Sequence, residues 1–338
     1  MGRSKRRHLP CPTPYVCTTT VTKIVPLGEI SDAVRRGVIS IGNFDGVHKG
    51  HAVLLREARR VADRVGGPVV AVVLDPHPAA ILRPNSIPEK LTWIERRAEL
   101  LGHQGADFLV VIPIDPTFLN LSAAEFFRSI VVDGLTARGM AEGPNFFFGR
   151  DREGNIETLE KLCRKNKIEL SIAHPSRDAD LMISSTRIRE RIAAGDIETA
   201  SALLGHPHRI RGKVVHGAAR GKTIGFPTAN LSEIDVLIPA PGVYGGFANV
   251  DSLSQGTQRF AAAIHIGPNP TFEDSDKGKV EIHLLDYTGD LYDQPLIVDF
   301  VIRVRDIARF DSQQQLVAQL NRDIKSIRNS LTPSERKT

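Results

Sequence analysis

The stretch from Val38 to His51, VISIGNFDGVHKGH, constrains the fold most strongly because it combines three local patterns in a fixed order. Residues 38–41 suit a short buried strand, Gly42 and Gly46 break it, and an amphipathic helix pattern follows from Lys49. A glycine turn lets the backbone approach a phosphate, and the unpaired amides and dipole of a helix N-terminus favour an anion. The pattern therefore predicts an anion site at the carboxyl end of a strand.

Two histidines in this stretch, His48 and His51, lie three positions apart and are expected to face the same anion. Imidazole N–H groups there can donate hydrogen bonds to oxygens that gain charge during phosphoryl or nucleotidyl transfer, a reaction that depends on positioning and charge stabilisation. The same His-x-x-His spacing also occurs in metal sites and at helix caps, so both alternatives stay open.

The composition excludes several classes of protein. A chain of 338 residues can form two domains with separate cores. With 41% hydrophobic and 25% charged residues it resembles a soluble globular protein, and no apolar run is long enough to span a bilayer. The net charge of +5 suits anionic substrates such as nucleotides but does not indicate nucleic-acid binding. Three cysteines without zinc spacing, Cys11, Cys17 and Cys163, favour reduced thiols and a cytoplasmic location.

The N-terminal segment contains no acidic residue before Glu29 and opens with four basic ones, Arg3, Lys5, Arg6 and Arg7. Prolines at positions 10, 12 and 14 interrupt any helix, and no hydrophobic core of a secretory signal follows. We expect a flexible basic extension over residues 1–24. A transit peptide or a nucleic-acid tail remains an alternative.

Residues 25–194 are expected to form an alternating α/β domain. Continuous apolar runs at residues 68–74 and 107–114 are typical of central strands in a parallel sheet covered on both faces. Capping boxes at residues 92–95 and 122–125 are expected to begin helices. Ligands of such doubly wound sheets bind beyond the carboxyl ends of the strands, where the glycine and histidine turn lies.

Three more segments are candidates for the same edge. Asp75–Pro78 follows a strand directly, although its prolines equally suit a rigid loop. Asn145, in the run GPNFFFG, can hydrogen-bond a nucleotide, whereas its phenylalanine neighbours are expected to pack in the core. In the run SSTRIR, helix capping alone can explain the hydroxyl groups, and the arginines add charge at an anion site; the candidate residues are Ser184, Ser185, Thr186 and Arg189.

After a short linker helix within residues 195–207, the pattern changes. Residues 208–338 consist of short alternating segments separated by Gly, Pro, Asn and Asp, which is typical of an antiparallel barrel or sandwich. From Leu296 to Val304 every second residue is apolar, which predicts an inward row, while Asp299, Arg303 and Arg305 are expected to face outward or toward a ligand. A helix over residues 312–327 is expected to close the domain.

The run from His216 to Thr223, HGAARGKT, suggests a Walker A loop but lacks the first glycine at the required spacing. The segment IGFP that follows would also break the helix that such a loop needs, so a P-loop is rejected. A glycine-rich basic turn containing Gly217, Gly221 and Lys222 can still hold a phosphate.

Glu281 lies in a strand whose neighbours alternate, so it is expected to project with His283 to the face opposite Val280 and Ile282. An acidic residue in such a strand is usually a solvent-facing one.

The first half resembles the nucleotidyltransferase module of bifunctional bacterial riboflavin kinase/FAD synthetases. The stretch at residues 42–51 matches that family's Gly-x-Phe-Asp-Gly-Val-His-x-Gly-His signature at Gly42, Phe44, Asp45, Gly46, Val47, His48, Gly50 and His51. The runs DPHP, NFFFG and ISSTRIR also resemble segments of the family, and the last of these helps to hold the triphosphate there. Leu74 and Pro144 depart from the aromatic and acidic residues usual in the family.

The second half resembles the riboflavin kinase motif Gly-[Arg/Lys]-x-Leu-Gly-Phe-Pro-Thr-Ala-Asn-Leu over residues 221–231. The resemblance implies that oxygens of Thr228 and Asn230 coordinate a magnesium ion on the ATP phosphates, although a turn closed by Asn230 is the simpler explanation of the short segment. It further implies that Glu281 is the base that accepts the proton of the ribityl hydroxyl.

Together the two resemblances imply an α/β doubly wound nucleotidyltransferase-like domain followed by an antiparallel β-barrel riboflavin kinase domain with a C-terminal helix. They imply conversion of riboflavin to FMN and of FMN to FAD, with ATP as co-substrate, Mg²⁺ as cofactor and no nucleic-acid or membrane partner; the oligomeric state is open. Two alternatives are retention of one activity and a nucleotidyltransferase for another cofactor. A nucleic-acid-binding protein is disfavoured because aromatic residues make up 6% and basic residues cluster only in the tail.

Overall fold

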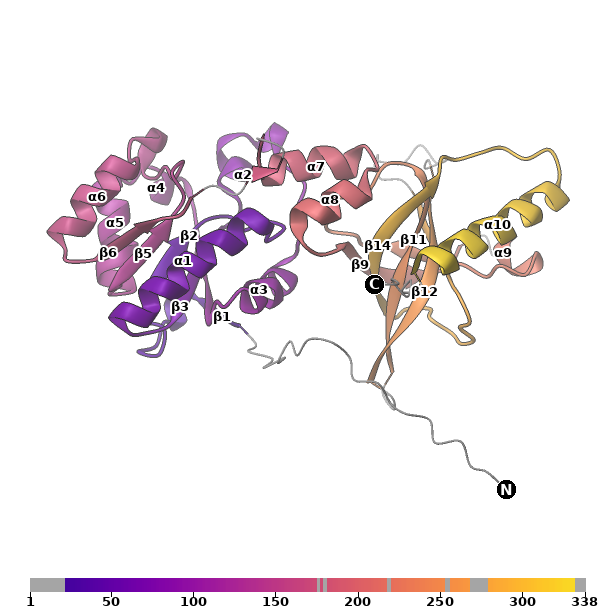
Figure 1. The fold of residues 1–338 in the computed structure, drawn as a ribbon, viewed down its shortest axis with the longest axis horizontal. Coiled ribbons are helices and arrows are strands. Elements are labelled where there is room, and N and C mark those ends of the chain that lie inside the picture. The colour runs from indigo at the N-terminus through magenta and orange to yellow at the C-terminus, as the bar shows by residue number, and fades with distance from the viewer. Residues whose placement is uncertain are drawn as a thin grey trace, which may run out of the picture.

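A computed structural model describes residues 22–174, 177–178, 181–217, 220–252, 256–267 and 279–331. Figure 1 shows an α/β half and a barrel half side by side, with helices α7 and α8 between them. The predicted basic extension, with Cys11 and Cys17, lies outside the described residues up to position 21. Strand β1 (Lys23–Pro26) pairs with a neighbouring strand, so residues 23 and 24 belong to the sheet rather than to that extension.

The α/β half contains a six-stranded parallel sheet, as the apolar runs predicted. Its central strands are buried on both faces because helices cover each side. In spatial order the strands are β1, β4 (Phe108–Pro113), β3 (Val69–Asp75), β2 (Val38–Ile41), β5 (Gly139–Glu142) and β6 (Glu169–Ile172).

Helices from both faces share hydrophobic clusters with the sheet. One face is covered by α1 (Lys49–Val65) and α3 (Ile94–His103), and the other by α5 (Ala123–Phe127), the π-helix η3 (Arg128–Gly134) and α6 (Ile156–Lys165). The remaining short helices are η1 (Leu27–Glu29), α2 (Pro78–Leu82), η2 (Pro84–Ser86), α4 (Pro116–Leu119) and η4 (Arg150–Arg152). The doubly wound arrangement is therefore confirmed.

The two predicted capping boxes have different outcomes. The Ser122 hydroxyl caps α5 by accepting from the Glu125 amide, and the Glu125 carboxylate accepts a hydrogen bond from the Ser122 amide, as expected. The box at Thr92 was wrong, because α3 begins at Ile94 with Trp93 as its N-cap and no side-chain cap. The Thr92 hydroxyl instead donates to Asp45 and accepts from the Gly46 amide. The Thr92 hydroxyl therefore forms tertiary hydrogen bonds instead of the helix cap that the local pattern predicted.

A helical hairpin joins the two halves. After the short strands β7 (Arg177–Asp178) and β8 (Leu181–Met182), helix α7 (Ser185–Ala193) leads to α8 (Ile197–Leu204). Asp196 caps α8, and Gly205 ends it in the left-handed conformation, as predicted for the linker helix.

The second half is a closed antiparallel barrel, which resolves the choice between barrel and sandwich. Strand order is β10-β13-β12-β11-β14-β9, and β10 pairs with β9 to close it. The strands are β9 (His208–Val215), β10 (Ala229–Ser232), β11 (Gly242–Ser252), β12 (Gly256–Gly267), β13 (Lys279–Leu284) and β14 (Pro295–Arg305). The one-turn helix α9 (Arg220–Thr223) precedes β10, and α10 (Gln313–Leu331) follows β14.

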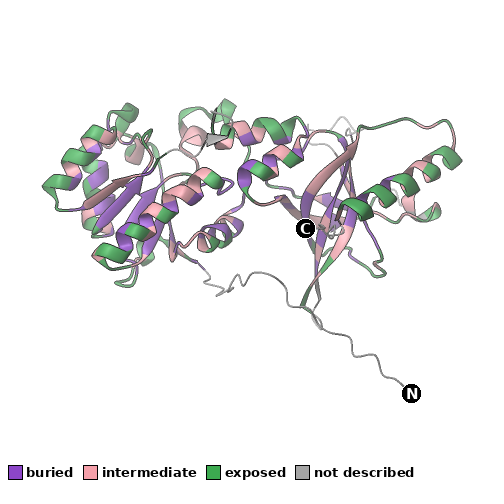
Figure 2. Ribbon diagram, viewed as in Figure 1, coloured by how far each residue is buried: buried purple, intermediate pink, exposed green. Residues whose placement is uncertain are grey.

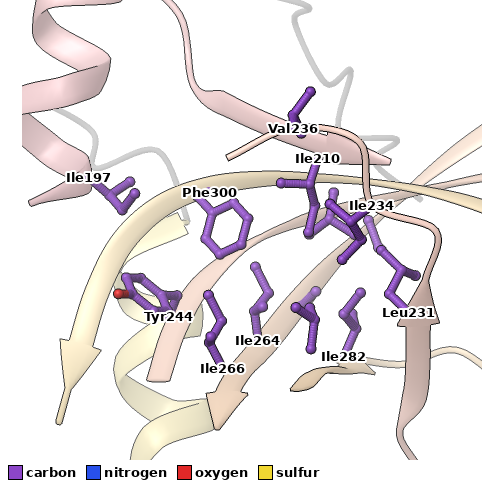
Figure 3. Close-up of a cluster of buried hydrophobic side chains, with 14 of the residues drawn as sticks. Ile197, Ile210, Leu231, Ile234, Val236, Tyr244, Ile264, Ile266, Ile282 and Phe300 are labelled. Atoms are coloured by element: carbon purple, nitrogen blue, oxygen red, sulfur yellow. The ribbon is translucent and has the colours of Figure 1, made fainter. Parts of the chain in front are cut away.

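The barrel core extends into the joining helices. Figure 3 shows Ile197 of α8 beside Phe300, Ile210 and Tyr244 of the barrel. The same cluster includes Ile188 and Ile192 of α7, together with Leu91 and Trp93 from the α/β half. Figure 2 shows buried surfaces of the joining helices at this junction. The predicted division after residue 194 therefore falls inside one continuous core.

The alternation along β14 holds for Leu296, Val298 and Phe300, which are fully buried. Asp299 lies on the face opposite this row but is not open to solvent, because its side chain is only 3% exposed and accepts two hydrogen bonds from Arg209, at 2.6 and 3.0 Å. These two residues are direct cross-strand partners between β14 and β9. A charged pair can thus occupy a buried position that the strand pattern predicted to be polar and open.

Candidate active sites

The turn between β2 and α1 forms the first candidate site. Gly46 has a φ of +82°, and a Cβ there would lie 2.9 Å from Leu91 Cδ1 and 3.0 Å from Leu204 Cδ2. Glycine is therefore required at this position by backbone conformation and by close packing. A Cβ at Gly42 would make only ordinary contacts with the Phe44 ring, so packing within the chain does not require glycine there.

His48 is the N-cap of helix α1 and has a defined tautomer. Its Nδ1 accepts hydrogen bonds from the amides of Gly50 at 3.1 Å and His51 at 3.4 Å. Burial lowers the pKa of His48 to about 4, so the ring is neutral at pH 7. With Nδ1 occupied as an acceptor, the proton lies on Nε2. His48 is thus both the predicted helix cap and a neutral N–H donor.

His51 stacks on His48 with ring centroids 3.7 Å apart. Burial, and then the neighbouring His48, keeps the pKa of His51 well below its usual range. Its Nδ1 is buried without a hydrogen-bond partner among the described residues. Phe44, itself 1% exposed, packs against His51 at 5.1 Å between centroids. The structure therefore brings the two histidines together, with Phe44 supporting them from the core.

Asp45 holds the turn in place rather than facing an open space. This carboxylate is 4% exposed and accepts hydrogen bonds from the amides of Leu91 and Thr92. It also forms ion pairs with Arg97 at 3.2 Å and Arg189 at 2.6 Å. Two cations and several donors surround one buried anion, which satisfies its charge internally.

The N-terminus of α7 lies against the same turn. The Ser185 hydroxyl donates to the Asp45 carbonyl at 2.9 Å, whereas the Ser184 hydroxyl caps the helix by accepting from the Arg187 amide. Thr186, in the first turn of α7, is exposed. Arg189 donates to the Glu89 carbonyl as well as to Asp45. The structure thus joins the turn and this segment, and it shows anchoring roles for Ser185 and Arg189.

The other predicted segments lie at this edge with different partners. Asn145 is exposed, and its amide points to the sulfur of Met182 at 3.8 Å, just before α7. His77 accepts from the Ala79 amide through Nδ1, and its Nε2 lies 2.8 Å from the Asn43 side chain. Leu74 is partly buried against the core of the sheet. Sequence reasoning identified His77 only as part of a turn and gave no signal for Arg97.

The second candidate site is a cavity of about 410 Å³ between the outer face of the barrel and helix α10. Glu281 lines it together with Lys279 and His283, so these side chains share the predicted face opposite Val280 and Ile282. The carboxylate accepts a hydrogen bond from Lys279 at 2.7 Å and lies 3.4 Å from His265 Nδ1. Hydrogen bonding to His265, and then to Lys279, outweighs burial and lowers the pKa of Glu281 to about 2.

Glu281 is the middle residue of a polar row across three strands. Its direct cross-strand partners are Asn230 on β10 and His265 on β12. Directly paired residues extend their side chains to the same face of a sheet, with Cβ atoms about 5 Å apart. Antiparallel pairing therefore aligns the predicted metal ligand Asn230 with the predicted base and an additional imidazole.

Asn230 is 7% exposed, and its Oδ1 is buried with no partner among the described residues. A Cβ at Gly217 would lie 2.0 Å from the Asn230 amide nitrogen, so only glycine fits there. A Cβ at Gly221 would lie 2.2 Å from the Phe226 carbonyl oxygen. A buried unpaired oxygen requires an explanation, and a hard cation is one that its chemistry fits. The side chain of Lys222 lies outside the described residues.

A second cavity of about 370 Å³, lined by Tyr287, Tyr292 and the Thr228–Ala229 segment, adjoins the first. Thr228 lines both cavities. The His283 ring donates from Nδ1 to the Pro227 carbonyl oxygen, 2.7 Å away, which fixes the chain just before Thr228. Thr228 therefore lies where a group could pass from one cavity to the other.

The sequence analysis assigned no role to His265 or Lys279. Alternation places Lys279 on the same face as Glu281, so that contact could have been expected. The position of His265 depends on the register between β12 and β13, which a single sequence does not reveal.

A parallel α/β domain with a histidine turn at its ligand edge, followed by a barrel with a cavity that contains Glu281, is the arrangement of a two-domain transferase that uses nucleotides. Residues 30–187 match the family model described as FAD synthetase, and residues 204–331 match the model described as riboflavin kinase. The chain belongs to the family of bifunctional riboflavin kinase/FMN adenylyltransferases.

Relatives support this assignment over most of the chain. The bifunctional riboflavin kinase/FMN adenylyltransferase of Pseudomonas fluorescens is 35% identical, covering 88% of this chain and 94% of the relative. That of Escherichia coli K12 is 34% identical, covering 87% and 93%. These findings confirm the resemblance and the order of the two domains.

A crystal structure titled macrolide-efflux protein, from Streptococcus pneumoniae, superposes with a TM-score of 0.82 at 33% identity, covering 90% of this chain and 99% of that one. It shows the same arrangement of both halves. Within the part of the present chain that the structure describes, no helix is long and apolar enough to cross a membrane.

Proposed function

We propose that this protein catalyses two ATP-dependent steps of FAD synthesis. The barrel domain converts riboflavin and ATP to FMN and ADP, and the α/β domain converts FMN and ATP to FAD and pyrophosphate. The observation that carries this proposal is the presence of both catalytic arrangements in one chain, the histidine turn and the cavity containing Glu281, in a protein of the bifunctional family.

In the kinase step, the more apolar cavity beneath α10 accepts riboflavin, and the neighbouring cavity with its tyrosines accepts the nucleotide. The ribityl hydroxyl then meets the γ-phosphate near Thr228, which lines both cavities. Glu281 accepts the hydroxyl proton as the oxygen forms its bond to phosphorus and ADP leaves. The low pKa of Glu281 keeps this carboxylate ionised at neutral pH.

The residues that would hold Mg²⁺ are Thr228 and Asn230. The unpaired buried Oδ1 of Asn230 supplies a hard oxygen ligand, and the glycine at position 217 leaves room beside it. When bound with ATP, the ion offsets the negative charge of the phosphate oxygens. Among the described residues no group of three His, Cys, Asp or Glu side chains could hold a metal, so we expect the substrate phosphates to supply ligands.

In the adenylylation step, the neutral His48 donates from Nε2 to the phosphate oxygens that gain charge as FMN attacks the α-phosphate. His51 supports that ring by stacking, and the N-terminus of α1 adds a favourable dipole. Gly42 leaves space for the phosphates. Asp45, Ser185 and Arg189 fix the turn, while Ser184, Thr186 and Asn145 remain proposed nucleotide contacts.

We place the protein in the cytoplasm with small-molecule partners only. The buried free thiol of Cys163 suits a reducing compartment, and the substrates are soluble nucleotides and flavins. No nucleic-acid or membrane partner is needed for the proposed reactions.

The test is to incubate the purified protein with ATP, Mg²⁺ and either riboflavin or FMN, and to separate the flavins over time. Riboflavin should give FMN and then FAD, and FMN should give FAD. FMN accumulation without FAD would restrict the protein to the kinase reaction. Turnover of neither flavin would favour a different nucleotidyl acceptor.

A further inference from the structure

Glu281 has two neighbours that bind its two oxygens separately. Lys279 Nζ lies 2.7 Å from Oε1, and His265 Nδ1 lies 3.4 Å from Oε2. Lys279 is on the same strand two residues away, whereas His265 is on β12, directly opposite Glu281 in the register. The carboxylate is therefore oriented by one contact along its strand and one across the sheet.

His265 belongs to the wall of the cavity but differs from a merely packed side chain. It is 43% exposed, lines the same cavity as Glu281, and its ring has space on the cavity side. Its contact with Glu281 is long for a hydrogen bond, as is common for catalytic contacts before a substrate is bound.

We propose that His265 is a positioning residue of the kinase site, which holds the Glu281 carboxylate through Oε2 so that a remaining lone pair faces the acceptor hydroxyl; this rests on the kinase function proposed above. Without His265, Lys279 alone would hold the carboxylate and could draw it along the strand, away from the hydroxyl. Since a small displacement of a catalytic group strongly slows a reaction, the donor at position 265 should affect kcat more than KM.

The test compares three substitutions of one residue. His265→Ala removes the ring, His265→Phe keeps a ring without a donor, and His265→Asn restores an N–H donor near the position of Nδ1. We expect the riboflavin kinase kcat to fall about 10-fold in the Ala and Phe variants and to recover to within about 3-fold in the Asn variant. KM for riboflavin should change less than about 2-fold. FAD formation from FMN, measured on the same samples, reports whether each variant is folded.

A double-mutant cycle with Glu281→Gln then separates positioning from packing. If His265 acts through Glu281, His265→Ala should cause little further loss in the Glu281→Gln background. Three results would each overturn the inference. They are an equally large loss of kcat in the Glu281→Gln background, equal kcat values for the His265→Ala and His265→Asn variants, and an effect confined to KM. Absence of FMN formation by the unsubstituted protein would instead overturn the proposed kinase function, so the two failures are distinguishable.

Discussion

The two candidate sites satisfy their polar groups in different ways. In the α/β half, Asp45 is buried and fully paired with Arg97, Arg189 and backbone amides, and His48 caps the helix that it begins. In the barrel half, Glu281 lines a cavity, and the neighbouring Asn230 oxygen has no partner among the described residues. Internal pairing of Asp45 anchors the turn of the first site, where Nδ1 of His51 has no partner among the described residues, whereas the second site offers the Asn230 oxygen as a ligand for a cation.

Because of this difference, substitutions in the two sites should affect folding and catalysis to different extents. Substitution of a fully paired buried charge leaves its partners uncompensated, so both folding and activity should suffer. Substitution of a group that faces a cavity removes a function at a smaller cost in folding. The two domains therefore offer contrasting tests of the same proposed pathway.

The Asp45→Asn substitution should produce the largest effect, because it leaves Arg97 and Arg189 without their buried anion. We expect the free energy of unfolding to fall by about 3 to 5 kcal/mol, measured by urea denaturation. FAD formation from FMN should also be lost because the turn is no longer anchored.

The matched control is Asp133→Asn, which removes an exposed carboxylate that pairs with Arg128 at 3.3 Å. This substitution should change the free energy of unfolding by less than about 0.5 kcal/mol. Equal stability of the two variants would show that the Asp45 network does not hold the turn.

For His48, the cap and the proposed donor can be separated. His48→Asn retains an acceptor for the helix amides, whereas His48→Ala removes it. Both substitutions should raise the activation free energy of FAD formation by about 2 to 4 kcal/mol, while the rate of FMN formation stays near normal. Only the Ala variant should also lose about 1 kcal/mol of the free energy of unfolding. Normal FAD synthesis by His48→Asn would reduce this residue to a structural cap.

Glu281→Gln keeps the shape of the side chain and removes the proton acceptor. Riboflavin phosphorylation should fall by about 10²-fold or more, and FMN adenylylation should continue. Because Lys279 and His265 would lose the charge of their partner, the free energy of unfolding should fall by about 1 to 3 kcal/mol, less than for Asp45→Asn.

The exposed carboxylate of Glu233 in the same barrel provides a matched control through Glu233→Gln, which should alter neither rate. An unchanged rate of FMN formation in Glu281→Gln would remove Glu281 from the mechanism. Loss of both activities would indicate coupling through the core that the two halves share.

The last prediction concerns pH, since neutral buried histidines lie in both halves, His48 and His51 in the α/β half and His208 in the barrel. Burial lowers the pKa values of His48 and His208 to about 4, from 6.5. Between pH 4 and pH 6.5 the unfolded chain binds more protons than the folded chain does. The free energy of unfolding should therefore fall as the pH drops from about 6.5 to 4. The loss should reach up to about 2 kcal/mol for each histidine at pH 5.

Urea denaturation at pH 7 and pH 5 measures this loss. The His208→Gln variant should lose part of the pH dependence, whereas the exposed His103→Gln should retain it. An identical pH dependence in all three proteins would show that His208 is not the group that titrates.

Some features of this protein were determined by the sequence alone. Apolar runs separated by glycines specify the parallel sheet, and strand alternation places Glu281 opposite Val280 and Ile282, because both depend on local periodicity. The Ser122 and Asp196 caps are likewise local, since their partners lie three residues away. The family motifs indicated both domains and their order.

Other features were decided only by the tertiary structure, because they depend on partners far away in the sequence. Thr92 bonds to Asp45 rather than capping its own helix, and Asp299 is buried by Arg209 across the barrel. The row of Asn230, Glu281 and His265 exists because strand register aligns three separate segments, and register is set by closure of the barrel. Local patterns can specify which face a side chain occupies, but the residue opposite it is determined by how the strands pair.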